Sequence, residues 1–291
     1  MWPPPASGIS LEDVKTRLVG YMLKAGKEAK VHTSWINPNN AYDKAVETFI
    51  NKALNPSKSN RFLDSFLAYH KRISRMGMIN SLAQVLIKIT SLGIPDTYQG
   101  CEVWDFSLVD PDNRQPVDFD HRKRLLQDLE PLLAVPSNMD AGSRTRGLLE
   151  MLDHWENGHI KMFVTACCLR FRRNHPNLFL EGGYLPLHVE GERGDHVVAF
   201  ARQSNSRFSI TLAPRLVAGL MEPELKWPVN SVWKGTHIIL PPGLSGKGTL
   251  RDLFTQQPIS ITMRDGQSTL DLEQVFALWP LALLVNDLDQ G

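Results

Sequence analysis

A short run near the middle of the sequence gathers the side chains best suited to acid–base and hydrogen-bonding chemistry: Asp110, Asp112, Asn113 and Arg114. The two carboxylates can act as general acids or accept hydrogen bonds. Because Pro111 lies between them, a turn-stabilising role is an equal alternative. Arg114 can bind the hydroxyl groups of a ligand, or it can fix the run through ion pairs with its acidic neighbours. The residue types indicate a polar binding loop whose individual roles stay open.

Four further side chains offer ring stacking or hydrogen bonding. Trp35 and Trp104 can stack on a ligand ring, although packing is the commoner role of tryptophan. Lys30 and His32 can donate hydrogen bonds to hydroxyl groups, with a solvated lysine and a structural histidine as the alternatives.

The first part of the chain must position these side chains with helices. Ser10 is typical of a helix N-cap with Asp13 three residues on, and apolar residues then recur every three or four positions. We expect further helices after Asn40, after Asn60, and over a fourth stretch that ends at Gly93. Additional helices are predicted after Asp120, near 144–155 and over 159–174.

A short apolar stretch, residues 94–98, follows the fourth predicted helix and opens into the polar loop 99–118. A helix followed by a short strand and a long loop is typical of an αβ step in an α/β fold. Long ordered loops on such scaffolds are often functional. The pattern therefore predicts a strand over 94–98 that presents the polar loop.

The apolar period changes to two after about residue 183. Alternating runs cover residues 185–189, 198–200, 208–212, 259–263 and 281–285, with turn-rich segments between them. This pattern predicts a small antiparallel sandwich or barrel, with a domain boundary near Gly182 and Gly183.

The composition is that of an ordinary globular protein and bears on a few classes of partner. The chain has 291 residues, of which 42% are hydrophobic and 22% charged, and its net charge of +1 does not favour nucleic acid or an acidic membrane surface as a partner. No apolar run approaches the length of a membrane span. Three cysteines without a pairing pattern fit a reducing cytoplasm. We find no metal-ligand spacing and expect no metal and no organic cofactor.

Several runs of residues carry a family resemblance. Residues 93–102 (Gly-Ile-Pro-Asp-Thr-Tyr-Gln-Gly-Cys-Glu) resemble the eighth strand and following turn of the α-amylase-type (β/α)8 barrel. Residues 108–119 contain Asp-Pro-Asp-Asn-Arg-Gln-Pro-Val-Asp, which is similar to a signature of maltooligosyltrehalose synthases. Residues 28–38 resemble the same family's Glu-Ala-Lys-x-His-Thr-Ser-Trp run, and residues 252–255 and 278–284 resemble its terminal β-domain. The resemblance spans nearly the whole chain in the family's order.

This resemblance implies an α+β multidomain fold. Residues 1–182 would form a mostly helical C-terminal part of the barrel with its last βα unit, and residues 183–291 would form an antiparallel β-sandwich domain. Loops at the C-terminal face of such a barrel hold the binding site. The candidate substrate-binding residues are Tyr98, Glu102, Trp104, Asp110, Asp112, Asn113, Arg114, Lys30, His32 and Trp35.

The catalytic carboxylates of the family have no counterpart here. Retaining glycosidic enzymes need a nucleophile and an acid about 5–5.5 Å apart. The family places them on earlier barrel strands, with a further Asp after a His, and this chain has no His-Asp dipeptide. We therefore assign no catalytic residue and expect the chain alone to be inactive. Since a barrel needs eight strands, its expected partner is the missing N-terminal barrel portion.

The resemblance implies that the complete enzyme acts on maltooligosaccharides. It would convert the reducing-end α-1,4 bond into an α,α-1,1 linkage by intramolecular transglycosylation. Another barrel glycosidase, such as a trehalose-releasing hydrolase, is a rival that the signature runs disfavour. A second rival is a non-catalytic module that binds glucan or buttresses the barrel. Exposure of Trp227, Trp233 or Trp279 would favour glucan binding.

Overall fold

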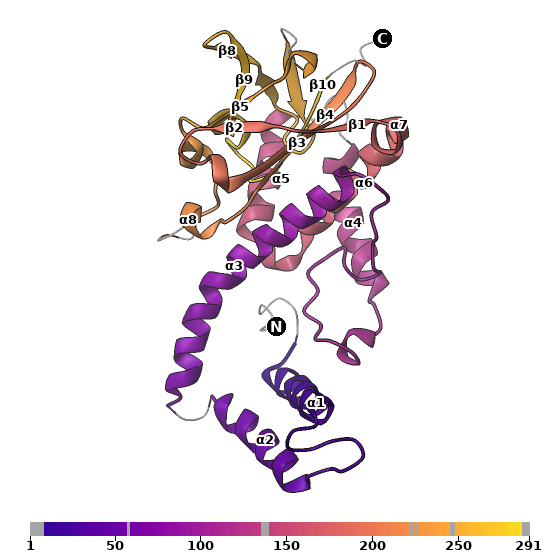
Figure 1. Ribbon diagram of the computed structural model, residues 1–291, viewed down its shortest axis with the longest axis vertical. Coiled ribbons are helices and arrows are strands. Elements are labelled where there is room, and N and C mark those ends of the chain that lie inside the picture. The colour runs from indigo at the N-terminus through magenta and orange to yellow at the C-terminus, as the bar shows by residue number, and fades with distance from the viewer. Residues whose placement is uncertain are drawn as a thin grey trace. The chain divides into compact units, whose positions relative to one another are not determined.

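The structure is a computed structural model that describes residues 9–56, 59–134, 140–221, 224, 226–244 and 248–286. Its backbone contacts divide the chain into two compact units, shown with their elements in Figure 1. The first unit comprises Met1–Ser74 with Trp104–Asp118, and the second comprises Arg75–Val103 with Phe119–Gly291. The predicted boundary at residues 182 and 183 lies inside the second unit, so two domains divided there stay a prediction.

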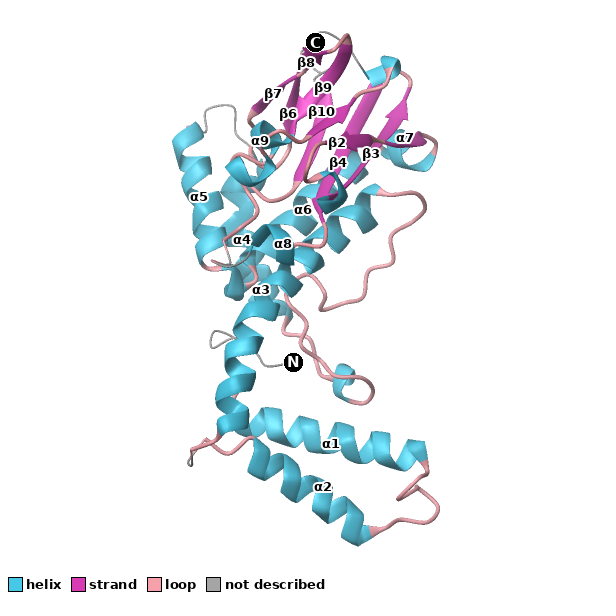
Figure 2. Cartoon of the chain, turned by 60° about the vertical axis from the view of Figure 1, so that its left-hand side comes forward, coloured by secondary structure: helices cyan, strands magenta, loops and turns pink. Residues whose placement is uncertain are grey.

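The first unit is helical. Helix α1 (Leu11–Ala29) and helix α2 (Asn40–Ala53) lie side by side, as Figure 2 shows, and α3 (Arg61–Thr90) begins in this unit. Ser10 caps α1 as predicted: its side chain accepts from the Asp13 amide at 3.1 Å, and Asp13 accepts in return from the Ser10 amide at 2.9 Å. A small apolar cluster from α2, α3 and the residue after α2 holds the unit together: Ile50, Leu54 and Leu63.

Helix α3 corrects one prediction. The sequence predicts two helices between Asn60 and Gly93, but the structure forms one helix of 30 residues. Gly77 is the only conformationally weak residue in the join, and one glycine costs a helix only about 1 kcal/mol. The helix ends at Thr90, and Gly93 adopts the left-handed conformation with φ of 79° shortly after it.

Residues 94–98 form neither a strand nor a helix. Ile94 and Tyr98 expose 86% and 75% of their surfaces, so the segment has no neighbouring strand against which to pack. A strand needs a hydrogen-bonded neighbour, and among the described residues none lies beside this segment. The predicted strand is therefore absent from the chain as it stands.

The second unit contains the other predicted helices. They are α4 (Phe119–Ala134), α5 (Ala141–Asp153) and α6 (His159–Asn174); the short α7 (Pro176–Leu180), which was not predicted, follows them. Helix α6 ends where Pro176 prevents the preceding residue from continuing it, as the sequence predicts. No helix among the described ranges combines the length and apolar character that crossing a membrane requires.

Two antiparallel sheets follow in the same unit. The six-stranded sheet has the order β1-β3-β4-β10-β6-β7, and the four-stranded sheet has the order β2-β5-β9-β8. The strands of the first are Gly183–Pro186, Val197–Ser204, Arg207–Pro214, Ala282–Asn286, Thr249–Asp252 and Pro258–Ser260, in that spatial order. Those of the second are His188–Glu190, His237–Ile239, Gln267–Asp271 and Thr262–Arg264.

Two of the alternating runs pass from one sheet to the other. The run 185–189 ends β1 in the six-stranded sheet and continues as β2 in the four-stranded sheet after Leu187. The run 259–263 divides in the same way at Ile261, between β7 and β8. Each was predicted as one strand. The core takes up only the middle of each run, Leu187 with Val189 and Ile259 with Ile261, whereas Leu185 and Met263 at the ends of the runs are exposed.

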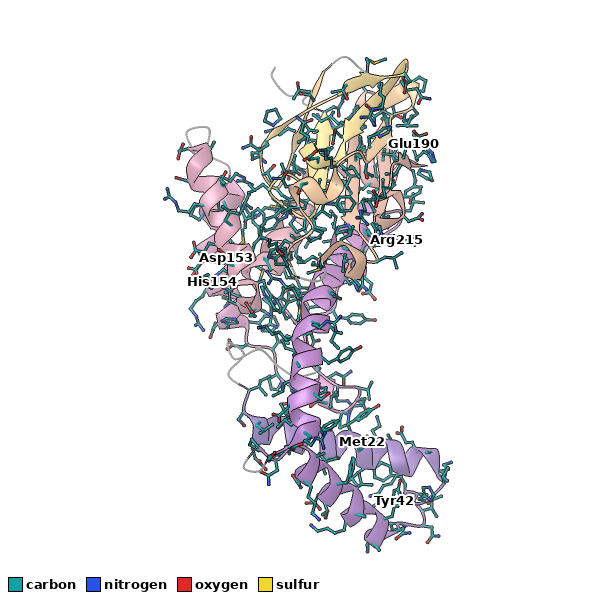
Figure 3. The ribbon with its side chains drawn as sticks, turned by 90° about the vertical axis from the view of Figure 1, so that its left-hand side faces the viewer. Met22, Tyr42, Asp153, His154, Glu190 and Arg215 are labelled. Carbon is teal, nitrogen blue, oxygen red and sulfur yellow. The ribbon has the colours of Figure 1, made fainter. Side chains whose placement is uncertain are left out.

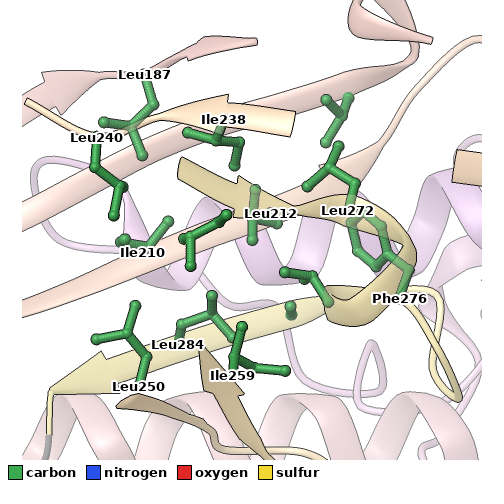
Figure 4. Close-up of a cluster of buried hydrophobic side chains, with 14 of the residues drawn as sticks. Leu187, Ile210, Leu212, Ile238, Leu240, Leu250, Ile259, Leu272, Phe276 and Leu284 are labelled. Atoms are coloured by element: carbon green, nitrogen blue, oxygen red, sulfur yellow. The ribbon is translucent and has the colours of Figure 1, made fainter. Parts of the chain in front are cut away.

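That core joins both sheets (Figure 4). It includes Ile210 and Leu284 from the larger sheet and Ile238 and Leu270 from the smaller one, each fully buried. Strand β4 does not alternate as predicted, because seven of its residues in succession are buried. Helices of the same unit lie along the opposite face of the larger sheet (Figure 1), and the Phe163 ring of α6 lies 6.0 Å from that of Trp279.

Candidate functional site

The polar run predicted to bind ligand lies in the first unit, against helix α1. Arg17 of α1 donates two parallel hydrogen bonds to the Asp112 carboxylate, from Nε to Oδ1 at 2.8 Å and from Nη2 to Oδ2 at 2.7 Å. The same Nη2 donates to the Phe106 carbonyl at 2.7 Å, and Asp112 also accepts from the Leu108 amide at 2.6 Å. One guanidinium thus joins the helix to both ends of a short loop.

These contacts fix the charge of Asp112. The hydrogen bonds from Arg17 lower the pKa of Asp112 below its ordinary value, and the Leu108 amide acts in the same direction. The same pair raises the pKa of Arg17. A carboxyl group held in its ionised form cannot serve as a general acid at neutral pH.

Lys24 of α1 holds the other predicted carboxylate. Its ammonium group donates to the Asp110 carbonyl and lies 3.5 Å from Asp110 Oδ2. Asp110 in turn pairs with Nε of Arg114. The side chain of Arg114 remains 74% exposed, and Asn113 is exposed beside it. The 3-10 turn Asp112–Arg114 therefore presents Asn113 and Arg114 outward, while Asp110 and Asp112 face α1.

The second predicted group lies in the loop between α1 and α2. Lys30 ends α1 in the left-handed conformation and is exposed, and the His32 ring lies 5.0 Å from that of Tyr42, which Figure 3 labels on α2. Trp35 is 62% exposed, and the Lys27 ammonium lies 4.8 Å from its ring centre. An exposed indole steadied by a cation is suited to stacking.

Lys24 brings the two sequence motifs to one helix. Besides Asp110, it contacts Glu28 Oε1 at 3.8 Å, and Glu28 begins the run that contains Lys30 and Trp35. Trp104 is half-buried in this first unit.

Tyr98 and Glu102 belong to the second unit. Tyr98 is exposed, and its carbonyl accepts from the Cys101 amide in a turn. Glu102 accepts from Arg122 Nε at 3.0 Å, and Arg122 also donates to the Gly100 carbonyl at 2.8 Å. The structure therefore holds Glu102 as an anchor of this turn.

Sequence reasoning missed the cations of α1. Arg17 and Lys24 are seven residues apart and lie on one face of the helix, next to the side of the buried Val14. Their spacing could have marked a basic stripe, but no local signal shows that its partner lies far along the chain. Among the described residues, no group of three or more His, Cys, Asp or Glu side chains could hold a metal ion.

The tryptophans of the second unit are not available to ligand. Trp227 is 9% exposed, and Trp233 and Trp279 are fully buried. Trp227 donates to the Leu152 carbonyl at 3.1 Å, and Trp233 donates to the Pro228 carbonyl at 2.7 Å. These side chains pack the unit and offer no stacking surface.

Comparison with known proteins gives one answer. A scan against protein-family models finds no matching model. A curated Mycobacterium tuberculosis protein, provisionally described as a maltooligosyl trehalose synthase, is 32% identical over 274 residues. That match covers 90% of this chain and 30% of the relative, so the chain spans less than a third of the relative's length.

Solved structures agree over nearly all of the chain. The maltooligosyltrehalose synthase of Arthrobacter ramosus matches with 30% identity and a TM-score of 0.69, covering 96% of this chain and 31% of that one. A second maltooligosyl trehalose synthase structure matches with 28% identity and a TM-score of 0.66, over 96% and 31%. A Sulfolobus tokodaii protein described as a hypothetical maltooligosyl trehalose synthase matches with 27% identity and a TM-score of 0.62, over 96% and 30%. The resemblance found in the sequence is confirmed: over nearly all of its length this chain is similar to maltooligosyltrehalose synthases, and it spans less than a third of their length.

Proposed function

We propose that this chain supplies the C-terminal portion of a maltooligosyltrehalose synthase, a (1→4)-α-D-glucan 1-α-D-glucosylmutase of the cytoplasm. The complete enzyme would cleave the reducing-end α-1,4 bond of a maltooligosaccharide through a glycosyl-enzyme. The released glucose would turn and re-attack through its anomeric hydroxyl, giving an α,α-1,1 linkage. The family match over 96% of the chain supports this proposal.

The proposed contribution of this chain is the wall around the released glucose. The observation that carries it is the loop of Asp110–Arg114, held on α1 with Asn113 and Arg114 exposed. A guanidinium and an amide can bind neighbouring sugar hydroxyls. Retaining the glucose and excluding water favours isomerisation over hydrolysis. Trp35, His32 and Lys30 are proposed as further sugar contacts, together with Trp104, Tyr98 and Glu102.

The chain alone is proposed to be inactive, because no catalytic carboxylate pair can be assigned to it. Its proposed partner is the N-terminal barrel portion, and neither nucleic acid nor a membrane is a proposed partner. In that assembly residues 94–98 would form the last strand of the (β/α)8 barrel. The two antiparallel sheets would form the terminal β-sandwich and buttress the barrel. Burial of the three tryptophans favours buttressing over glucan binding.

The test is a chimera. The matching 31% of the Arthrobacter ramosus synthase is replaced by this chain, and maltopentaose turnover is followed as loss of reducing ends. We expect the chimera to be active and the chain alone to be silent. Turnover by the isolated chain, or a folded chimera without activity, would contradict the proposal.

The variant Arg114→Ala in the chimera tests whether this loop holds the released glucose. We expect more free glucose relative to trehalose-linked product, because the released glucose is held less firmly. Lys44→Ala is the control, since Lys44 is 72% exposed on α2 and its one ion-pair partner among the described residues is its helical neighbour Glu47. An unchanged product ratio in Arg114→Ala would assign Arg114 a structural role only.

A further inference from the structure

Helix α1 directs two cations at one loop. Arg17 and Lys24 are separated by seven residues, two turns of helix, so they share a face. Both contact residues 106–112, which follow them by more than eighty positions. Met22, which Figure 3 labels, belongs to the same helix. The pairing of this helix with this loop therefore depends on two long-range contacts.

The Arg17 contact is the stronger of the two. The side chains of Arg17 and Asp112 are only 22% and 12% exposed, so water screens the pair less than an ordinary surface pair. The two parallel hydrogen bonds from one planar guanidinium, here called the fork, fix the direction of the Asp112 carboxylate as well as its distance from Arg17. Because Asp112 also accepts from the Leu108 amide, the fork orders the loop backbone and not just one side chain.

The Lys24 contact reaches Arg114 through one intermediate. Lys24 holds the Asp110 backbone carbonyl and faces its carboxylate, and that carboxylate pairs with Arg114. The direction in which Arg114 points is thus set from α1. Removing either cation would leave Asn113 and Arg114 exposed but would no longer fix the direction of their side chains.

We infer that Arg17 and Lys24 are positioning residues: they fix the backbone of residues 106–112 so that Asn113 and Arg114 meet a sugar hydroxyl. This inference rests on the proposed function for the identity of the ligand. The contacts of Arg17 and Lys24 with residues 106–112, called the clamp from here on, lie within the first unit and can be measured without turnover.

The first experiment uses the isolated chain. Hydrogen exchange at the amides of Leu108, Asp112 and Arg114 is compared in Arg17→Ala, Arg17→Lys and Lys44→Ala. We expect at least about tenfold faster exchange in Arg17→Ala, since each tenfold corresponds to about 1.4 kcal/mol of lost protection. Arg17→Lys should restore little, because an ammonium cannot form the fork. Exchange that is unchanged in Arg17→Ala would overturn the clamp.

The second experiment uses the active chimera. Arg17→Ala is expected to lower the ratio of isomerisation to hydrolysis about tenfold, because a small displacement of a binding group has large kinetic effects. Asp112→Asn combined with Arg17→Ala should do no further harm, since Arg17 acts through Asp112. A reduced yield of folded protein with an unchanged product ratio would refute the positioning role.

The two experiments separate the two claims. Loss of protection in the isolated chain, together with a silent wild-type chimera, would reject the proposed function and keep the clamp. An active wild-type chimera, together with unchanged protection in Arg17→Ala, would keep the proposed function and reject the clamp.

Discussion

Asp112 is held as an anion by three donor groups, two from Arg17 and one from the Leu108 amide. Its oxygens are therefore engaged before any ligand arrives, and its charge serves the loop. Asp110 is similarly placed between Lys24 and Arg114. At the scale of single residues, the run divides into two carboxylates that fix the loop and two exposed side chains, Asn113 and Arg114, that can meet a ligand.

Acid should loosen this unit. The folded-state pKa of Asp112 is lowered, so its stabilising contribution is complete above the unfolded value of about 3.9 and is lost as the pH falls through the folded value. We expect Asp112→Asn to cost about 2 kcal/mol at neutral pH, from the loss of charged hydrogen bonds. The difference from wild type should shrink below pH 3.

Urea-induced loss of helical circular dichroism measures this difference. Glu47→Gln is the control, because its pair with Lys44 is exposed and should contribute little at any pH. A difference that stays constant between pH 7 and pH 3 would show that ionisation of Asp112 does not stabilise the fold.

The sequence could identify these residues but not their partners. The run around Asp110 was recognisable from its own residue types. Arg17 lies 95 residues before Asp112, and no local pattern connects them. Which of the carboxylates would be engaged and which side chains exposed depended on that distant contact, so the roles of Asp112 and Arg114 stayed open.

At the scale of elements, the helices were the most predictable part. Ser10 with Asp13 and Asn39 with the Tyr42 amide are local signals that mark helix starts. The strands depended on distant pairing instead. Strand β5 (His237–Ile239) was missed because it is short and its hydrogen-bonded neighbours are β2 and β9, distant in sequence.

Continuity of α3 leads to a prediction. Gly77 is exposed in the interior of this helix, and a Cβ built there meets nothing within 4 Å. We expect Gly77→Ala to stabilise the chain by about 0.7 kcal/mol, because alanine favours helix and reduces the freedom of the unfolded state. Urea denaturation measures the change.

Gly93 supplies the opposite control for that substitution. Its φ of 79° is strained for any residue with a Cβ, so Gly93→Ala should destabilise. If Gly77→Ala destabilised instead, α3 would have to depart from helical geometry near residue 77.

At the scale of the whole molecule, the second unit carries an exposed apolar segment, residues 92–98, which pairs with no strand in the described part of the chain. Leu92, Ile94 and Tyr98 expose 60%, 86% and 75% of their surfaces. Arg172 fixes the start of the segment by donating to the Ile89 and Gly93 carbonyls. An exposed apolar segment of this kind is available for contact with another chain.

Self-association of the isolated chain is the expected result. Light scattering should show a mass that rises with concentration, and Ile94→Gln combined with Tyr98→Gln should reduce that rise. Leu180→Gln is the control, since Leu180 is 66% exposed on α7, away from the segment in sequence. Equal association in the double variant and the control would exclude the segment as the contact surface.

The buried arginines of the second unit differ from Arg17 in one respect: the described partners of Arg144 and Arg202 are carbonyl oxygens. Arg144 donates to the Phe254 and Leu132 carbonyls, and Arg202 donates to those of Ser91, Phe179, Gly182 and Gly183. Carbonyl oxygens do not titrate. Burial also raises the pKa of Asp252 in the folded state. As the pH falls toward the pKa that Asp252 has in the unfolded state, protonation of this carboxyl group therefore favours the folded state increasingly. Acidification should therefore dismantle the protein in a fixed order, with the helical signal of α1 and α2 falling while the near-ultraviolet signal of the buried Trp233 and Trp279 persists.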